Sequence, residues 1–107
     1  MKTRFHAVPV RPNAGKAIGE IKTIAPHPQR EQDAVVSLFV QRAEDVAGVP
    51  NFVASETGHA INVTIRRGRQ LPLQPGSTVQ LTVRYEGDER GGGFYANAAD
   101  FQIIAPR

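Results

Sequence analysis

The stretch Leu73-Gln74-Pro75-Gly76-Ser77 opens an alternating run from Thr78 to Glu86, and this part of the chain decides the fold class. One face of the run is apolar and the other polar: Val79, Leu81, Val83 and Tyr85 against Gln80, Thr82, Arg84 and Glu86. A period of two is typical of a β-strand with one buried face. A glycine-rich segment over residues 87–93 follows, and an extended pattern restarts at Phe94. The sequence therefore predicts a turn, a strand, a hairpin loop and a closing strand.

Three further strands are predicted upstream of this hairpin. Residues 16–25 carry isoleucines at the spacing of a helix, but their β-branched content and the internal Gly19 favour a strand that bends or bulges at this glycine. Residues 33–42 form a near-continuous apolar run, which predicts a strand covered on both faces. Residues 59–66 alternate between apolar and polar side chains, as a half-buried strand does.

The two ends of the chain carry further extended patterns. Residues 4–10 contain Pro9, which confines an extended segment to a sheet edge, so we expect an N-terminal edge strand over residues 1–12. At the other end, the alternation over residues 94–104 changes phase, and a β-bulge near Ala99-Asp100 reconciles its two halves. Together these patterns predict an all-β protein.

The composition predicts one domain that stands on packing alone. A chain of 107 residues has room for one hydrophobic core, and we expect a single domain over residues 1–107. Cysteine is absent, which excludes disulfides, thiolate metal ligands and cysteine nucleophiles. No apolar segment reaches the length of a signal peptide core or a membrane span. We therefore expect a cytoplasmic protein without a membrane partner.

The net charge of +3 conceals a segregation along the chain. Residues 1–30 hold six basic residues and one acidic residue, whereas residues 31–60 hold one basic and five acidic residues. Residues 61–90 are basic again, with five arginines against three carboxylates. A basic face is suited to phosphates, but the acidic segment argues against general coating of duplex DNA.

The order of these features resembles the OB-fold. In that fold a bent first strand with a central glycine leads to a long second strand, an alternating third strand and a turn into the fourth. A hairpin and a closing strand complete it. Here the turn is Pro75-Gly76, the hairpin is rich in glycine, and the closing strand reads Tyr95-Ala96-Asn97-Ala98. Residues 16–104 are similar in this pattern to small bacterial proteins of the single-stranded-DNA-binding type.

The resemblance implies an all-β, five-stranded OB-like barrel over residues 16–104, with the N-terminal edge strand as an addition. One departure is the proline-containing stretch over residues 67–77, which has no room for the helix that many OB-folds carry there. An SH3-like barrel and a small sandwich are the alternatives. We further expect the strands over 59–66 and 78–86 to be neighbours.

If the fold is OB-like, the ligand surface lies across the second and third strands and their flanking loops. Single-stranded nucleic acid needs cations there for its phosphates and exposed rings for its bases. The candidate cations are Lys22, Arg30, Arg42, Arg66, Arg67 and Arg69. We expect the arginines at 42, 66, 67 and 69 to share one exterior face.

The candidate stacking rings are Phe52, on the long acidic connection over residues 43–58, and Tyr95. Tyr95 follows Phe94, and two adjacent residues of a strand cannot both face the interior. Phe39 shares its parity with Val35 on a strand covered on both faces, so it has no preferred side.

Catalytic and metal-binding motifs are missing from the sequence. His6, His27 and His59 lie in separate elements without metal-ligand spacing, and the acidic hairpin over residues 86–89 lacks the ligand pattern of a calcium loop. We therefore predict a non-enzymatic binding module without metal or cofactor, which binds single-stranded DNA or RNA. The alternative is a protein-interaction or assembly module, either a homo-oligomer or an accessory subunit, suited to strand addition at an unpaired edge.

Overall fold

A computed structural model describes residues 11–88 and 91–106 of the chain. In this part of the chain the strands are β1 (Gly15–Pro26), β2 (Ala34–Asp45), β3 (Ala60–Arg66), β4 (Thr78–Asp88), β5 (Gly91–Asn97) and β6 (Gln102–Ala105). Three short 3-10 helices join them: η1 (Phe52–Glu56), η2 (Gly68–Gln70) and η3 (Ala98–Asp100). None of the described helices has the length and apolar character needed to cross a membrane. The prediction of an all-β protein is confirmed.

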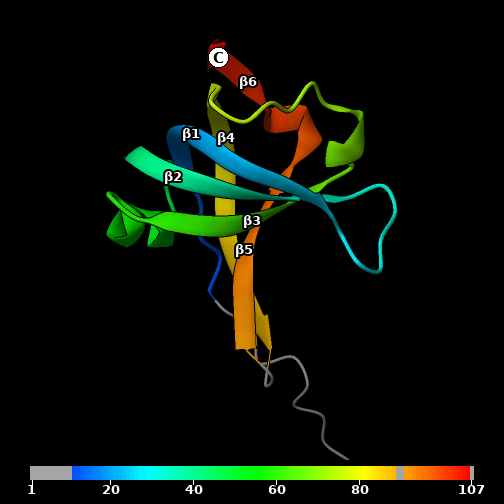
Figure 1. Cartoon of the computed structure of the whole chain (residues 1–107). Helices are drawn as coiled ribbons and strands as arrows, with labels where there is room; N and C mark the ends of the chain where they lie inside the picture. The colour runs from blue at the N-terminus through cyan, green and yellow to red at the C-terminus, as the bar shows by residue number, and fades with distance from the viewer. Residues whose placement is uncertain (1–10, 89–90, 107) are drawn as a thin grey trace, which may run out of the picture.

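Five of the strands close into a barrel (Figure 1). The strands follow one another around it in the order β1, β2, β3, β5 and β4, and β4 pairs with β1 to complete the circle. β3 and β5 run parallel, and the other pairs in the barrel are antiparallel. β6 pairs with β4 outside this circle. The fold is a closed, mixed, five-stranded OB-like barrel with one extra strand.

The barrel closes because β1 bends and pairs on both of its edges. Residues 15–20 pair with both β2 and β4, whereas the only described strand that pairs with residues 21–26 is β2. The register with β2 shifts between Ile18 and Gly19, where the extra residue is Gln41 of β2, and again between Ile21 and Thr23, where the extra residue is Lys22 of β1. An irregularity in the pairing is therefore present at Gly19 as predicted, but at this point the extra residue belongs to the partner strand. A Cβ at Gly19 would overlap the carbonyl oxygen of Phe39. Only glycine fits this close approach of two backbones.

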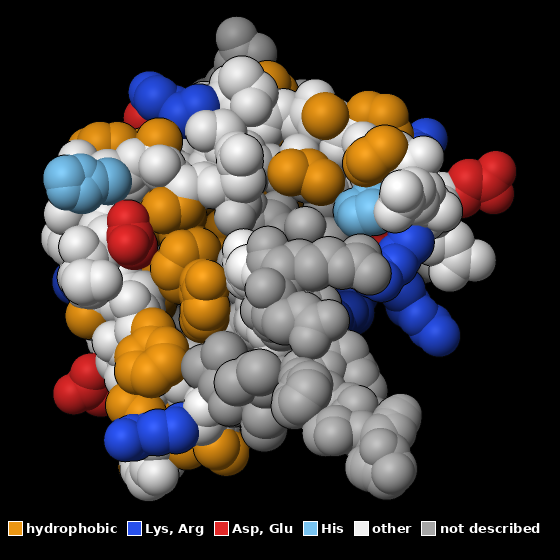
Figure 2. Space-filling view, turned by 90° about the horizontal axis from the view of Figure 1, so that it is seen from below, with side chains coloured by type: hydrophobic (Ala, Val, Ile, Leu, Met, Phe, Trp, Pro, Cys, Tyr) orange, Lys and Arg blue, Asp and Glu red, His pale blue; other side chains and the backbone are white. Residues whose placement is uncertain are grey.

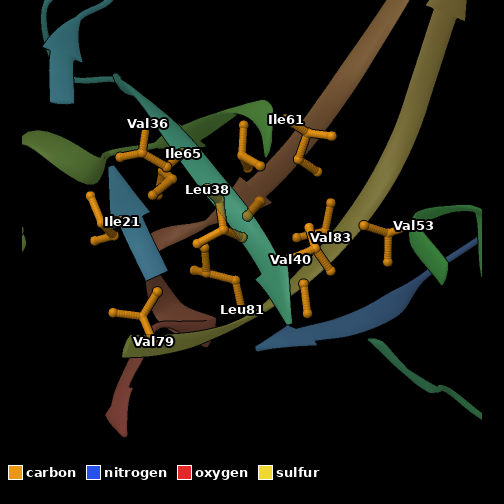
Figure 3. Close-up of a cluster of buried hydrophobic side chains, with 13 residues drawn as sticks. Ile21, Val36, Leu38, Val40, Val53, Ile61, Ile65, Val79, Leu81 and Val83 are labelled. Carbon is orange, nitrogen blue, oxygen red and sulfur yellow. The ribbon is translucent and has the colours of Figure 1, made fainter. Parts of the chain in front are cut away.

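Apolar side chains from all five barrel strands fill the interior (Figure 3). The fully buried side chains of greatest volume are Ile21, Leu38, Ile65, Leu81, Val36, Val40, Val53, Val63, Val79 and Val83. Val53 comes from η1, which contacts β1, β2 and β4. Leu71 and Leu73, in the connection after η2, pack against the same core and stand where many OB-folds carry a helix. The two connections therefore supply apolar side chains that the strands alone do not provide.

Two expectations about the strands need correction, and a third lies outside the described residues. β3 and β4 are not neighbours, because β5 lies between them. The strand expected over residues 94–104 is two strands, since η3 ends β5 and redirects the chain into β6. The N-terminal edge strand expected over residues 1–12 falls almost wholly outside the described residues, and Arg11 and Pro12 are not in a strand. The additional strand that the structure describes is β6.

Replacing Gly19 by alanine tests the role of the bulge. The new Cβ meets the backbone of β2 and cannot be accommodated unless the two strands separate, and overpacking of this kind costs about 1–3 kcal/mol. We expect Gly19→Ala to lower the free energy of unfolding by about 2 kcal/mol in urea denaturation. Gly93→Ala is the matched control, because its Cβ makes only an ordinary contact of 3.7 Å with Tyr95. Equal losses in both variants would contradict this account of barrel closure.

Candidate nucleic-acid interface

A buried carboxylate holds two arginine-bearing segments together. Asp33, only 7% exposed, ends the loop between β1 and β2. Its Oδ1 accepts a hydrogen bond of 3.0 Å from the backbone N–H of Arg67, and its Oδ2 lies 3.7 Å from Nη1 of Arg30. Arg67 has a φ of 63°, the left-handed conformation, which costs an arginine energy that this hydrogen bond offsets. The loop and the turn after β3 therefore form one unit.

A second set of contacts completes this unit. The backbone N–H of Arg69 donates to the carbonyl of Gln32 at 3.1 Å, and its Nη1 donates to the carbonyl of Glu31 at 3.1 Å. Gly68 is buried between them, and a Cβ there would lie 2.8 Å from Cβ of Ile65. We call Arg30, Arg66, Arg67 and Arg69 the arginine cluster, since the end of β3 and the loop over residues 27–33 meet here.

Tyr95 lies on the outer surface next to the arginine cluster. In the register it stands between Thr64 of β3 and Arg84 of β4, while its neighbours Phe94 and Ala96 pack against the core. The expectation that only one of the adjacent aromatic residues faces inward is confirmed. The inward ring of Phe94 packs edge-on against Tyr85, with the ring centroids 5.3 Å apart.

Arg66 bridges from β3 across Tyr95 to β4. Its Cζ lies 4.7 Å from the centroid of the Tyr95 ring, a cation–π arrangement. Its Nη2 and Nη1 donate to the two carboxylate oxygens of Glu86 at 2.9 and 3.3 Å. Nε of Arg84 donates to the same carboxylate at 3.0 Å. One carboxylate thus orients two arginines beside one ring.

These contacts shift the pKa values of both partners. The hydrogen bond from Arg66, together with that from Arg84, lowers the pKa of Glu86 despite partial burial. The same hydrogen bond to Glu86 raises the pKa of Arg66. Both groups therefore stay ionised at neutral pH. Within the described residues, the contacts given above link five arginines (Arg30, Arg66, Arg67, Arg69, Arg84) to three acidic residues (Glu31, Asp33, Glu86).

Three of the predicted site residues lie away from the arginine cluster. The arginine cluster lies next to the first residue of β2, and Arg42 is eight positions further along this strand, a separation of roughly 26 Å. Its Nη2 lies 2.9 Å from Oε2 of Glu44. Phe52 is half-buried in η1, next to an asparagine that bonds to the end of β2. Lys22 lies in the middle of β1, 3.5 Å from Glu20. The expectation that Arg42 shares a face with the other three arginines is wrong, since β2 is too long.

Two outward residues of the barrel exterior are missing from the predicted set, one on β2 and one on β4. Phe39 faces outward, because Leu38 and Val40 on either side of it are fully buried. The apolar run around it hid this parity in the sequence. Arg84 was assigned to the polar face of its strand, but its place beside Tyr95 depends on the pairing of β4 with β5.

Among the described residues, the basic side chains do not form a continuous patch on the face seen from below. Figure 2 shows Lys and Arg in separate groups around the edge of that face, with hydrophobic side chains between them. Within residues 11–88 and 91–106, no three His, Asp or Glu side chains lie together in a way that could hold a metal ion. The arginine cluster is thus a local feature of one end of the barrel.

Comparison with known proteins assigns no family, because no family model, curated protein or solved structure matches the chain. The geometry of the barrel and its arginines is therefore the basis on which a function is inferred.

Glu86→Gln tests the carboxylate that orients these arginines. Because the pKa of Glu86 is lowered from its ordinary 4.5, its contacts stabilise the protein fully above pH 4.5, and this contribution is lost as the pH falls through the lowered value. The Glu86 side chain is 38% exposed, so solvent screening limits the effect to about 1 kcal/mol or less. Urea denaturation should show Glu86→Gln less stable than wild type at neutral pH and equally stable in strong acid. A difference that does not change with pH would contradict the assignment.

Proposed function

We propose that this protein binds single-stranded nucleic acid, phosphates first, along the outer face of β3 and β5 and across the arginine cluster. The observation that carries the proposal is the convergence of four arginines next to an outward tyrosine on a closed OB-like barrel. Barrels of this type use the surface of their second and third strands, with the flanking loops, for oligonucleotides.

The arginine cluster retains capacity for phosphate. Arg67 uses only its backbone N–H in the contact with Asp33, and within the described residues its side chain forms no ion pair. Arg69 uses one guanidinium nitrogen for a neutral carbonyl. A guanidinium has several donors in a fixed fork, so its other donors suit phosphate oxygens. The contact to the Glu31 carbonyl holds the Arg69 side chain, which limits the entropy that this side chain loses on binding.

Tyr95 and Arg66 together provide a stacking surface for bases. Aromatic rings and arginine planes both stack on nucleobases, and Arg66 already lies over the ring of Tyr95. Phe39, outward on β2, adds a second ring to the exterior. Neither ring reads a base edge, so we expect little sequence preference.

Glu86 competes with the ligand for Arg66. Its carboxylate occupies two nitrogens of Arg66 and one of Arg84, the same donors that a phosphate would use. Binding must therefore exchange a carboxylate for a phosphate at this point, which keeps the affinity modest. Salt weakens both contacts, but only the phosphate contact releases counterions.

The arginine cluster should set the salt dependence of binding to oligothymidine. Four phosphate contacts predict a slope of log K against log salt of about −3, and loss of one contact reduces its magnitude by about 0.7. We expect Arg67→Ala to lower affinity and slope in fluorescence anisotropy titrations. Arg42→Ala is the matched control, because it removes one arginine at the far end of β2 and should change neither. An affinity indifferent to ionic strength, or equal effects of both variants, would contradict the proposal.

Removing the competing carboxylate should strengthen binding. We expect Glu86→Gln to raise the affinity for oligothymidine about two- to fivefold at low salt, up to about 1 kcal/mol, because Arg66 and Arg84 become available to phosphates. The same anisotropy titration measures this. A lower affinity in Glu86→Gln would show that orientation of Arg66 matters more than its release.

A second candidate function is assembly through β6. All four of its residues are exposed, with Ile103 at 43% and Ile104 at 52%, and within the described residues it pairs only with β4. An uncharged edge strand of this kind is suited to strand addition. Light scattering over a range of concentrations separates the candidates. A stable oligomer that does not bind oligothymidine favours assembly, and a monomer that binds it favours the first proposal.

A further inference from the structure

A pocket of about 260 Å³ opens at the end of the barrel next to the arginine cluster. The residues around it come from the end of β1, the start of β2, and the chain from η2 onward: Ile24, Ala25, Pro26, Ala34, Gly68, Arg69, Leu71 and Leu73. Most of these side chains are apolar, and Arg69 is the charged one. Because Arg69 also belongs to the arginine cluster, the pocket and the proposed phosphate surface are continuous.

Within residues 11–88 and 91–106, no strand pairs with the edge of β1 beside this pocket. Ile21 exchanges backbone hydrogen bonds with Gly76 and Ser77, at 2.8 and 2.9 Å, on the side away from β2. Beyond this point the described chain pairs β1 only with β2. The backbone groups of successive residues point to alternate edges of a strand, and the extra residue Lys22 shifts this alternation by one position. The N–H and C=O of Ile24 therefore point to the edge away from β2, as those of Ile21 do. The pocket thus offers one backbone donor, one backbone acceptor and a guanidinium between apolar walls.

We propose that this pocket binds one unstacked nucleobase of the single strand, an inference that rests on the proposed function. A nucleobase has apolar faces for the walls and donors and acceptors on its edge for Ile24 and Arg69. A purely aliphatic ligand would leave those polar groups without partners. The volume is below that of typical drug-sized sites, so it suits a single ring system and excludes a whole nucleotide chain. Phosphates on either side of the base then reach Arg67 and Arg30.

Fluorescent oligothymidines test the proposal. Each carries one aminopurine base, placed at the first, a central or the last position, and aminopurine fluorescence rises when the base leaves its stacked neighbours. We expect the rise on binding at one of these positions. Ala25→Phe, which adds a ring at the opening of the pocket on an exposed strand position, should abolish the rise and weaken binding about fivefold, the equivalent of about 1 kcal/mol. Thr82→Phe, which adds the same ring on β4 away from the pocket, is the matched control and should retain the rise.

The outcomes separate the two proposals. If wild type binds the oligonucleotides but no position brightens, or if Ala25→Phe brightens as wild type does, the pocket proposal is overturned and the phosphate surface stands. If no oligonucleotide binds at low salt, both proposals fail. Circular dichroism of Ala25→Phe establishes that it is folded; should it unfold, Leu73→Phe narrows the same pocket from the opposite wall and replaces it in the test.

Discussion

The bend of β1 at Gly19 is the constraint on which the rest of the structure depends. A straight strand would keep the same two neighbours along its length in an open sheet. β1 instead pairs with β2 over its whole length and with β4 over its first half, and this second pairing closes the barrel. Closure brings the inward faces of five strands onto one core and turns the polar faces outward. It also ends the pairing between β1 and β4 at Glu20, so that among the described strands the second half of β1 pairs only with β2 and has a pocket beside it.

Two carboxylates then organise the exterior at this end of the barrel. Asp33 is buried and joins the loop after β1 to the turn after β3, which holds Arg67 and Arg69 side by side through backbone contacts. Glu86 is partly exposed and orients Arg66 and Arg84. Asp33 positions Arg67 through its backbone N–H and leaves its guanidinium donors available. Glu86 instead accepts hydrogen bonds from the guanidinium groups of Arg66 and Arg84. A ligand with phosphates therefore meets prepared donors at one place and a competitor at the other.

The sequence predicted the strand patterns well and their arrangement less well. Alternation identified the inward positions of β3 and β4, and Gly19 in an isoleucine-rich segment identified one of the two points at which the pairing of β1 with β2 shifts. The sequence did not predict that β5 lies between β3 and β4, because strands that follow one another in the chain are expected to pair. The parallel pairing of β3 with β5 has no signature in the sequence of either strand. The sequence predicts a bulge where the structure has the turn at η3, since both features change the phase of an alternation.

By itself, the sequence determined properties that are local to a strand or a turn: the period of a strand, the rule that Phe94 and Tyr95 cannot both face inward, and the density of arginines at the end of β3. These follow from steric rules within a few residues. Only the tertiary structure decided which charges meet. Arg66 reaches Glu86 twenty positions away and Arg67 binds Asp33 thirty-four positions away, whereas Arg42 is separated from them by the length of β2. Such contacts depend on strand order and register, because residues far apart in the chain become neighbours only after the barrel closes.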